Sequence, residues 1–559
     1  MTPQRYDSAV LFVHGIGEQR RGATLDEFGG SLVDSARAWY GADNVRDIDS
    51  GLPRTDDTPE HKAVLVTRPG REPLRLLLAE SCWAEEVRAP RWGALMVWLT
   101  GTVPFLVQRA VDAGMRRSTR KMGGNGRALA TLGFGALRLA QNVFAVTLAL
   151  LVLGALFTVG LVAGLAPVRE RLFDARTQDF PLWAKLGALA TLIPIAFFLA
   201  DSPSPAERAA LIAASALPVV VLLSLSGRLR AIVVGFIGDS YALLHEHGSH
   251  NAIVDRVAAD LSWVESAAGS APAVIVAHSQ GAEVARRVLA GRSLAATPIA
   301  GLVTFGAGIA KLRAVDQLRG QRRRSFAAFA LRVLSAVCVC LAPILLLTAE
   351  AGAPWRLATA AALVAAGAIA LTAARKELQR IVGAHLDPGA LGIDERQVSH
   401  WTDLHASHDL VSEGDLPVAK CTRGFSRTVV NRRSMLLDHV AYWHNVEGFQ
   451  ATVALEIERA ALGHADTARP EALAQAQRAR ESTICRIDGA RLAVAAVTPA
   501  LWWHFEWSLL AGAILVGAGA GLLVAISKLL DIQAAAQTRA LMTAPDPVVA
   551  PRRLVAALR

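Results

Sequence analysis

The sequence has few cysteines and few charged residues for its length. Only 5 of its 559 residues are cysteine and 19% are Asp, Glu, Lys or Arg, whereas about 25% is usual for a soluble domain. The cysteines are widely spaced and form no C-x-x-C pair, which excludes a disulfide framework and a zinc finger and indicates a reducing compartment. The N-terminal MTPQRYDSAVLFVHG lacks the apolar core and cleavage site of a signal peptide, so we do not expect cleaved secretion.

Hydrophobic residues, in contrast, make up 53% of the sequence and gather in long uncharged runs. A helix of about 17–25 apolar residues can cross a bilayer. Six runs meet this length if Lys185 extends toward the interface: 143–166, 181–200, 209–226, 333–349, 357–374 and 507–527. Two weaker runs lie at 92–108 and 492–505. We therefore expect an integral membrane protein whose first partner is the lipid bilayer.

The apolar runs separate three stretches of ordinary charge with short β-like runs, namely 1–91, 227–325 and 375–490. Together they hold roughly 300 residues, the size of one domain. We expect these stretches to form one soluble domain. The segments between and after them would be a membrane helical insertion at 92–226, a transmembrane hairpin at 326–374, and a C-terminal membrane segment and tail at 491–559.

Basic residues flank the expected hairpin on both sides, at 322–324 and 375–380, whereas its loop carries one basic residue. The positive-inside rule then predicts a cytoplasmic soluble domain on the cell inner or plasma membrane. The topology of 92–226 stays open, because a fourth span at 92–108 would put six basic residues on the far side. The formal net charge of +10 gathers at membrane flanks, which favours anionic lipid headgroups as partners and gives no case for nucleic acid.

Three β-like runs end in small-residue turns. The run at 9–13 ends in His14-Gly15-Ile16-Gly17, and the run at 273–277 ends in His278-Ser279-Gln280-Gly281 before a helix-like stretch. The third run, at 299–305, ends in Gly306-Ala307-Gly308. A strand, a sharp small-residue turn and a helix are the setting of a nucleophile elbow. Ala277 stands where G-x-S-x-G has its first glycine, and alanine is the next smallest residue.

The segments VLFVHGIG and VIVAHSQG resemble the α/β-hydrolase superfamily, in particular its serine lipase and esterase branch. The resemblance covers the three soluble stretches and not the membrane runs. It implies an α/β fold with a mostly parallel sheet flanked by helices, here interrupted by transmembrane helical insertions. The residues that support the motif match are His14, Gly15, Gly17, His278 and Gly281.

The same resemblance implies the chain order Ser, then Asp or Glu, then His. Ser279 is then the nucleophile. Asp409, followed by an apolar pair, matches a D-x-V position at the end of a later strand, and Asp403 is the alternative acid. His439 lies in a DH-x-x-Y segment like that around the histidine of several lipase-like hydrolases, and His444 is the alternative.

The oxyanion hole is expected at the backbone N–H groups of Ile16 and Gln280, because the fold uses the residue after the nucleophile and one in an early loop. No metal or cofactor is expected. The segment around His245 and His247 lacks the H-E-x-x-H spacing, and Gly306 with Lys311 lacks the phosphate-loop spacing. A chelating role for His405, His408 and Asp409, and a loop-ordering or helix-capping role for Asp239, are weaker alternatives.

These patterns predict a membrane-embedded serine hydrolase that cleaves an acyl ester, of which a lipid ester is one form, through a Ser-His-Asp triad and an acyl-enzyme. A catalytically inactive hydrolase fold that serves as a membrane scaffold is the first alternative. A transporter is the second, although acidic or basic residues are rare deep inside the apolar runs. Substrate identity and oligomeric state stay open.

Overall fold

The computed structural model describes residues 6–87 except 18 and 69–71, scattered positions between 95 and 146, 238–347, 354–382, and 391–463 except 407, 408, 410, 413 and 432–437. Strands from all three soluble stretches join one eight-stranded sheet, in the order β2-β3-β4-β1-β5-β6-β7-β8. The strands are β1 (Ser8–Val13), β2 (Val45–Ile48), β3 (His61–Val66), β4 (Leu74–Ser81), β5 (Ala273–His278), β6 (Gly301–Phe305), β7 (Trp401–Ala406) and β8 (Phe425–Val429).

All strands of this sheet run in one direction except β3, which is antiparallel to both of its neighbours. The two central strands, β1 and β5, are buried at every position. They read as continuous apolar runs because a parallel sheet is covered on both faces. The expected α/β class with a mostly parallel sheet flanked by helices is therefore confirmed.

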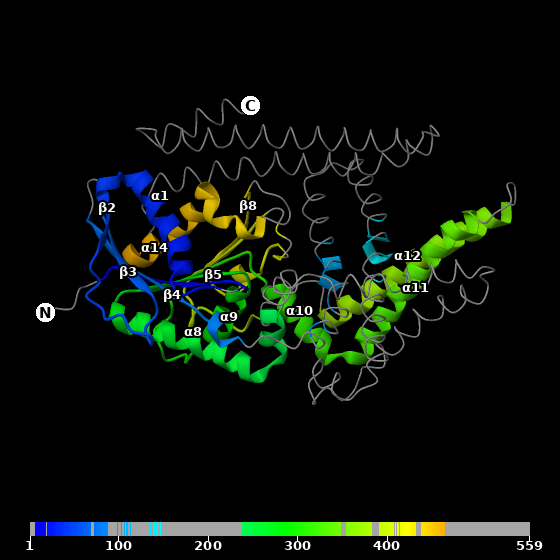
Figure 1. Ribbon diagram of the computed structural model, residues 1–559, viewed down its shortest axis with the longest axis horizontal. Coiled ribbons are helices and arrows are strands. Elements are labelled where there is room, and N and C mark those ends of the chain that lie inside the picture. The colour runs from blue at the N-terminus through cyan, green and yellow to red at the C-terminus, as the bar shows by residue number, and fades with distance from the viewer. Residues whose placement is uncertain are drawn as a thin grey trace, which may run out of the picture.

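Helices cover both faces of the sheet (Figure 1). On one face, Leu11 and Ile275 pack with α8 (His247–Ala268), α9 (Ser279–Ala290) and α10 (Ile309–Gly320). On the other face, Phe12 and Val276 pack with α1 (Gly30–Tyr40) and α14 (Ala451–Leu462). The alternation follows from the two-residue period of a strand. Short 3-10 or π turns are η1 (Leu25–Gly29), η2 (Ala42–Asn44), η3 (Ala84–Glu86), η4 (Val418–Lys420), η5 (Asp438–Val440), η6 (Tyr442–His444) and η7 (Val446–Gln450).

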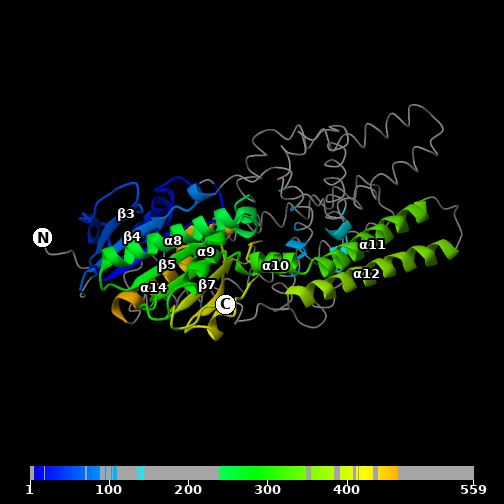
Figure 2. The same ribbon diagram turned by 90° about the horizontal axis from the view of Figure 1, so that it is seen from below.

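A helical hairpin of α11 (Arg322–Leu347) and α12 (Pro354–Val382) extends away from the sheet (Figures 1 and 2). Both helices are long and apolar enough to cross a membrane, over Arg323–Ala342 and Trp355–Val382. Only 33% and 28% of their most apolar windows are buried, so neither helix is a core helix of the sheet domain. The other expected spans lie largely or wholly outside the described residues.

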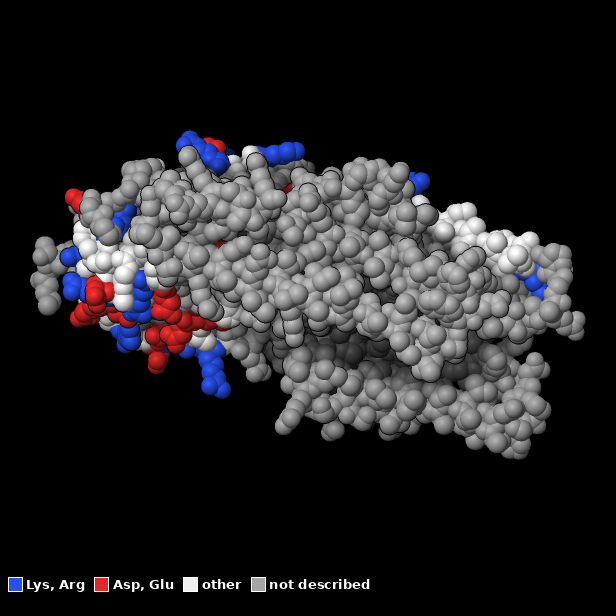
Figure 3. All heavy atoms as spheres, turned by 90° about the horizontal axis from the view of Figure 1, so that it is seen from above, with Lys and Arg blue, Asp and Glu red and all other residues white. Residues whose placement is uncertain are grey.

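The visible surface agrees with this division. In Figure 3 acidic and basic side chains gather over the sheet-bearing part, whereas the described surface of the hairpin is mostly uncharged. Large apolar side chains are exposed along the hairpin, among them Leu357, which is 66% exposed, and Ile369, which is 71% exposed. An apolar helical surface of this kind needs a partner or a bilayer to cover it.

Candidate active site

The turn that carries Ser279 is strained. Strand β5 ends at His278 and α9 begins at Ser279, whose φ is +54°. Among the described residues it is the only residue other than glycine with a positive φ. Such strain costs of order 1–3 kcal/mol and is typical of functional turns. The turn holds Ser279 at the carboxyl edge of the parallel strands.

Two glycines allow the loops around Ser279 to approach each other. A Cβ on Gly281 would lie 2.1 Å from the His14 carbonyl oxygen, and a Cβ on Gly15 would lie 2.8 Å from the Ser279 Cβ. No side-chain carbon fits at the first of these distances. The turn after β1 and the turn after β5 therefore pack backbone against backbone.

The structure brings Ser279, His439 and Asp409 together. The Ser279 hydroxyl lies 2.8 Å from His439 Nε2, and His439 Nδ1 lies 3.0 and 3.1 Å from the two Asp409 carboxylate oxygens. Asp409 follows β7 and His439 lies in η5 after β8. The carboxyl ends of the parallel strands β5, β7 and β8 meet at one edge of the sheet, so residues up to 160 positions apart form one hydrogen-bonded chain.

The alternative acid and histidine lie elsewhere. Asp403 is inside β7, where its carboxylate accepts hydrogen bonds from Thr304 Oγ1 at 2.8 Å and Ser426 Oγ at 2.7 Å and so joins three neighbouring strands. His444 is exposed on η6. Of the two acids and two histidines considered from sequence, the geometry selects Asp409 and His439.

The described residues contain no group of three His, Cys, Asp or Glu side chains that could hold a metal ion. His405 accepts or donates a hydrogen bond at 2.8 Å with Thr428 Oγ1. His245 stacks on Tyr241 with ring centroids 4.9 Å apart. His408 lies outside the described residues. These histidines therefore have structural contacts where the sequence left a chelating role open.

The carboxylate of Asp409 is fully buried and is held in its charged form. Burial alone would raise the pKa of Asp409, but His439 and hydrogen bonds from Val411 and Tyr442 hold that pKa well below its usual range. Besides His439, the carboxylate accepts from the N–H of Val411 at 2.7 Å, the N–H of Ser412 at 3.3 Å and the hydroxyl of Tyr442 at 2.9 Å. Charge-assisted bonds of this kind fix the carboxylate in one orientation.

Tyr442 contacts Asp409 and has no role in the sequence-based prediction. Its hydroxyl accepts from the Ala406 N–H at 2.6 Å and donates to Asp409 Oδ2. Burial, and then the charge of Asp409, raise the pKa of Tyr442 well above its ordinary value, so it stays a donor. The signal was present in the Asp438-His439-x-x-Tyr442 spacing, which puts the tyrosine one turn beyond the histidine.

His278 contacts both the backbone and the ring of His439. Burial, and then the proximity of His439, lower the pKa of His278 to about 3, so its ring is neutral at pH 7. Its Nε2 lies 2.9 Å from the backbone carbonyl of His439 and donates to it. The ring also stacks on His439 and on Phe305, with centroids 4.8 and 4.7 Å apart. His278 thus fixes both the backbone and the ring plane of His439.

His14 fixes a peptide in the loop after β1. Its Nε2 accepts from the Trp83 N–H at 3.2 Å, so Nδ1 carries the proton and donates to the Gly15 carbonyl at 2.7 Å. Burial lowers the pKa of His14 to about 4, which keeps the ring neutral. The C=O and N–H of a trans peptide point in opposite directions, so the Ile16 N–H faces away from His14.

Asp239 links this loop to the helix after Ser279. Its carboxylate accepts from the Gly17 N–H at 2.8 Å, and its backbone carbonyl accepts from Gln280 Nε2 at 3.0 Å. The Ser240 hydroxyl donates to Gln280 Oε1 at 2.7 Å. Residues 238–240 are already helical, so Asp239 orders a loop and does not cap a helix end. It ties together the two segments that carry Ile16 and Gln280.

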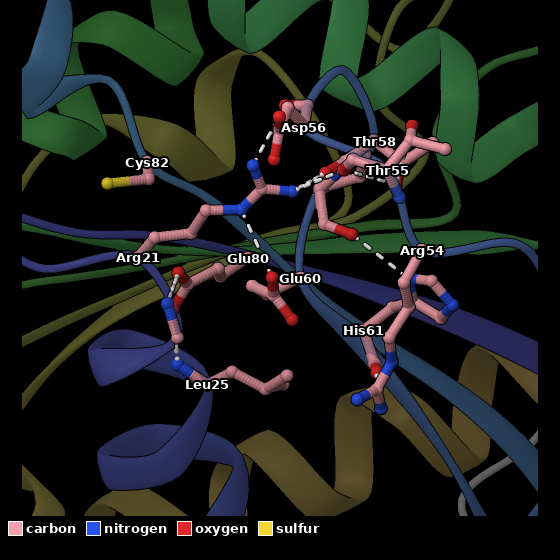
Figure 4. Close-up of polar contacts among 12 residues, drawn as sticks. Arg21, Leu25, Arg54, Thr55, Asp56, Thr58, Glu60, His61, Glu80 and Cys82 are labelled. Atoms are coloured by element: carbon pink, nitrogen blue, oxygen red, sulfur yellow. Dashed lines mark hydrogen bonds and ion pairs between the residues drawn. The ribbon is translucent and has the colours of Figure 1, made fainter.

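The far end of the same loop is fastened to the sheet (Figure 4). The Arg21 guanidinium donates to the carbonyls of Asp56 at 2.8 Å, of Thr55 at 2.7 Å and of Thr58, and pairs with Glu60 at 3.1 Å. On β4, the carboxylate of Glu80 accepts from the Leu25 N–H at 2.7 Å and from the Gly22 N–H. The segment 14–25 is therefore held at both of its ends.

No protein-family model matches this chain, and no curated protein and no solved structure is significantly similar to it. The chemistry of the site therefore rests on its own geometry. A serine hydroxyl in hydrogen-bond contact with an imidazole, itself oriented by a buried carboxylate, is the arrangement that activates a serine for nucleophilic attack.

Proposed function

We propose that this protein is a membrane-bound serine hydrolase of the α/β-hydrolase type, which cleaves acyl esters through a covalent acyl-enzyme. The observation that carries the proposal is the continuous chain from Ser279 through His439 to Asp409, with links of 2.8 and 3.0 Å and a strained serine at its head. The strand order supports it, because the three residues follow three parallel strands in the chain order of that superfamily.

In the first half-reaction, the Ser279 oxygen attacks the acyl carbon and forms the new C–O bond, while the hydroxyl proton moves to His439 Nε2. Asp409 stabilises the imidazolium that results. The carbonyl oxygen becomes an oxyanion, which the N–H groups of Gln280 and Ile16 stabilise. Gln280 is in the first turn of α9, where backbone N–H groups have no partner within the helix.

Collapse of this intermediate breaks the ester bond, and the departing alcohol takes the proton from His439 Nε2. In the second half-reaction, a water molecule attacks the acyl-enzyme and gives its proton to the same nitrogen. The acid leaves, the proton returns to Ser279, and the free enzyme is restored. Water supplies the only co-reactant, so no cofactor is required.

The α11–α12 hairpin supports a lipid-like ester as substrate and a place at the membrane. The two helices carry exposed apolar surface, and basic residues lie in the helix ends nearest the sheet domain, at 322–324 and 375–380. Under the positive-inside rule, this distribution favours a sheet domain on the cytoplasmic side of the inner or plasma membrane. An ester dissolved in the bilayer could then pass directly from the membrane surface to the sheet domain.

A serine-reactive fluorophosphonate probe tests the proposal on the full-length chain in detergent. Wild-type protein is expected to label, and Ser279→Ala is expected to lose the label. Ser262→Ala is the matched control, because Ser262 is exposed on α8 and its hydroxyl donates to the Ala258 carbonyl of its own helix. Absence of labelling in folded wild-type protein would favour the inactive scaffold, and labelling that persists in Ser279→Ala would remove Ser279 as nucleophile.

A further inference from the structure

A second polar cluster, buried in part, lies in the helical part, away from Ser279. Asp112 pairs through one carboxylate oxygen with Arg138 at 2.7 Å and through the other with Arg375 at 2.9 Å. Arg332, which is 3% exposed, lies within electrostatic range of Asp112 and Arg375. We call these four residues, with Ser335, the arginine cluster. Its described members carry three positive charges and one negative charge.

Several donors of the arginine cluster are buried and lack a partner among the described residues. They are Arg332 Nη2, Arg375 Nε and the hydroxyl of Ser335, which is fully buried. Arg332 and Ser335 are three positions apart and so lie on one face of α11. A buried donor without a partner is costly, and more so on a charged group. Donors in excess, together with excess positive charge, fit an oxygen-rich anion.

The depth of the cluster along the hairpin indicates where that anion would come from. Arg332 lies ten residues into α11 and Arg375 seven residues before the end of α12, in the half of the hairpin nearer α10 (Figures 1 and 2). Of the eight large apolar side chains exposed on the hairpin, seven lie beyond the cluster toward the tip: Leu334, Val337, Leu341, Trp355, Leu357, Val364 and Ile369. Arg332 directly precedes the uncharged run 333–349, and Arg375 directly follows the uncharged run 357–374. If these two runs fill the hydrocarbon layer, the cluster lies at the depth of the headgroups.

We propose that Arg332, Ser335 and Arg375 bind a phosphate group, supplied by the headgroup of an anionic phospholipid or by free phosphate. Guanidinium groups bind phosphate oxygens in pairs. A tetrahedral phosphate offers oxygens in several directions to donors from two helices, whereas a planar carboxylate offers two in one plane. Asp112 keeps Arg138 and Arg375 in place without cancelling the charge. The proposal does not depend on the hydrolase chemistry at Ser279.

The test uses the full-length chain in dodecyl maltoside micelles, which contain no phosphate. Thermal unfolding is followed by the fluorescence of the 12 tryptophans in three arms: added phosphatidylglycerol, inorganic phosphate against chloride at equal ionic strength, and oleate. We expect phosphatidylglycerol to raise the unfolding midpoint of the wild type by several degrees. Arg332→Gln and Arg375→Gln should each weaken the apparent affinity about tenfold or more, the loss expected for one charge-assisted hydrogen bond.

Arg380→Gln is the matched control. It removes the same charge from the same helix, but Arg380 is exposed and pairs with Glu377, so its affinity should equal that of the wild type. Should Arg332→Gln fail to give folded protein by circular dichroism and gel filtration, Ser335→Ala removes a neutral donor of the same cluster and is expected to weaken affinity as well.

Each arm decides one point. A shift with inorganic phosphate that the same variants abolish supports the phosphate site and names free phosphate as its source. A shift with phosphatidylglycerol alone supports the site with a lipid source. A rise of the unfolding midpoint with oleate alone would overturn the proposal, because the site would then bind a carboxylate. No rise in any arm would overturn it as well. An equal loss of affinity in Arg380→Gln would also overturn it, because the effect would then come from general surface charge.

Discussion

The polar cluster around Ser279 and the arginine cluster both contain buried donors, but they differ in how those donors are paired. Around Ser279, each of the groups His14, His278, His439 and Asp409 has a hydrogen-bond partner, and the two supporting histidines are neutral. In the arginine cluster, Arg332 and Ser335 have buried donors without a described partner.

This difference separates two ways of building a polar site. A cluster whose bonds are all made is preorganised, so no reorganisation is needed when charge develops in a transition state. A cluster with spare donors is costly until something binds, and its stability should then depend on a ligand. Mutations in the two clusters should therefore differ in their effects on activity and stability.

The largest effect is expected at the carboxylate. Asp409→Asn should lower kcat by about 10⁴-fold, because the amide no longer fixes the protonated Nδ1 tautomer of His439. Asp403→Asn is the matched control, since Asp403 is equally buried but bonds to Thr304 and Ser426. Rates of p-nitrophenyl ester hydrolysis measure both. A larger loss in Asp403→Asn would show that the wrong acid has been assigned.

The next largest effect is expected where backbone packs against backbone beside the polar cluster around Ser279. Gly281→Ala should lower the free energy of unfolding by about 3 kcal/mol or more, because its Cβ would lie 2.1 Å from the His14 carbonyl and the neighbouring backbone would have to move. Gly320→Ala, at a position with no atom within 4 Å, should be tolerated. Urea denaturation compares the two, and equal stability would contradict the close approach.

The neutral histidines should make stability fall in mild acid. The folded pKa of His278, about 3, lies below the ordinary value of 6.5. Between these pH values the histidine is protonated in the unfolded chain and neutral in the folded chain, so the free energy of unfolding decreases as pH falls below 6.5. One such histidine lowers the free energy of unfolding by about 2 kcal/mol between pH 7 and pH 5.

His278→Phe removes the titrating group while it keeps a ring beside Phe305. The loss of stability between pH 7 and pH 5 should therefore be smaller by about 2 kcal/mol than in the wild type, as measured by urea titrations at the two pH values. An unchanged difference would mean that His278 is protonated in the folded protein, and the neutral support of His439 would have to be abandoned.

A smaller effect is expected at the link between the two loops. Asp239→Ala should lower kcat about tenfold with little change in KM, because Gly17 loses its anchor and the Ile16 N–H is less well positioned for the oxyanion. Asp255→Ala, at an exposed position on α8, is the control. If KM rises and kcat is unchanged, Asp239 acts on substrate binding and not on the oxyanion.

The smallest expected effect is a change in the free energy of unfolding, which should differ between the two clusters. In phosphate-free detergent, Arg332→Met should change the free energy of unfolding by less than about 1 kcal/mol or stabilise the protein, since it replaces with an apolar chain a buried charge that has no ion pair among the described residues. Tyr442→Phe, in the polar cluster around Ser279, should lower the free energy of unfolding by about 1–2 kcal/mol, because Asp409 and Ala406 both lose a partner. The reverse order would erase the difference between the clusters.

Local pattern predicted much of the sheet and the serine turn. The runs at 9–13 and 273–277 could be recognised as strands because β1 and β5 are covered on both faces and are therefore continuously apolar. Small residues mark the turns that follow them. The third run is shorter than expected, since β6 begins at Gly301 and Ile299 makes only an isolated bridge to Val398. The chain order of the superfamily that the motifs resemble supplied both pairs of alternatives.

Pattern could not choose within those pairs or find the supporting contacts. Asp403 and Asp409 lie six residues apart in one segment of the sequence, and only the extent and register of β7, which ends at Ala406 and pairs Asp403 with Thr304, separate them. The contacts of Trp83 with His14, and of Asp239 with Gly17, join residues 69 and 222 positions apart. Such contacts depend on how the sheet is assembled, and no local spacing encodes them.

The most direct test of the central claim is the mass of the acyl-enzyme. Full-length protein mixed with p-nitrophenyl butyrate should release p-nitrophenol in a burst, and the peptide that contains Ser279 should gain one butyryl group. Asp403→Asn should show the same adduct, and Ser279→Ala should show neither burst nor adduct. Ester turnover by Ser279→Ala at the wild-type rate, or an adduct on another residue, would contradict the account.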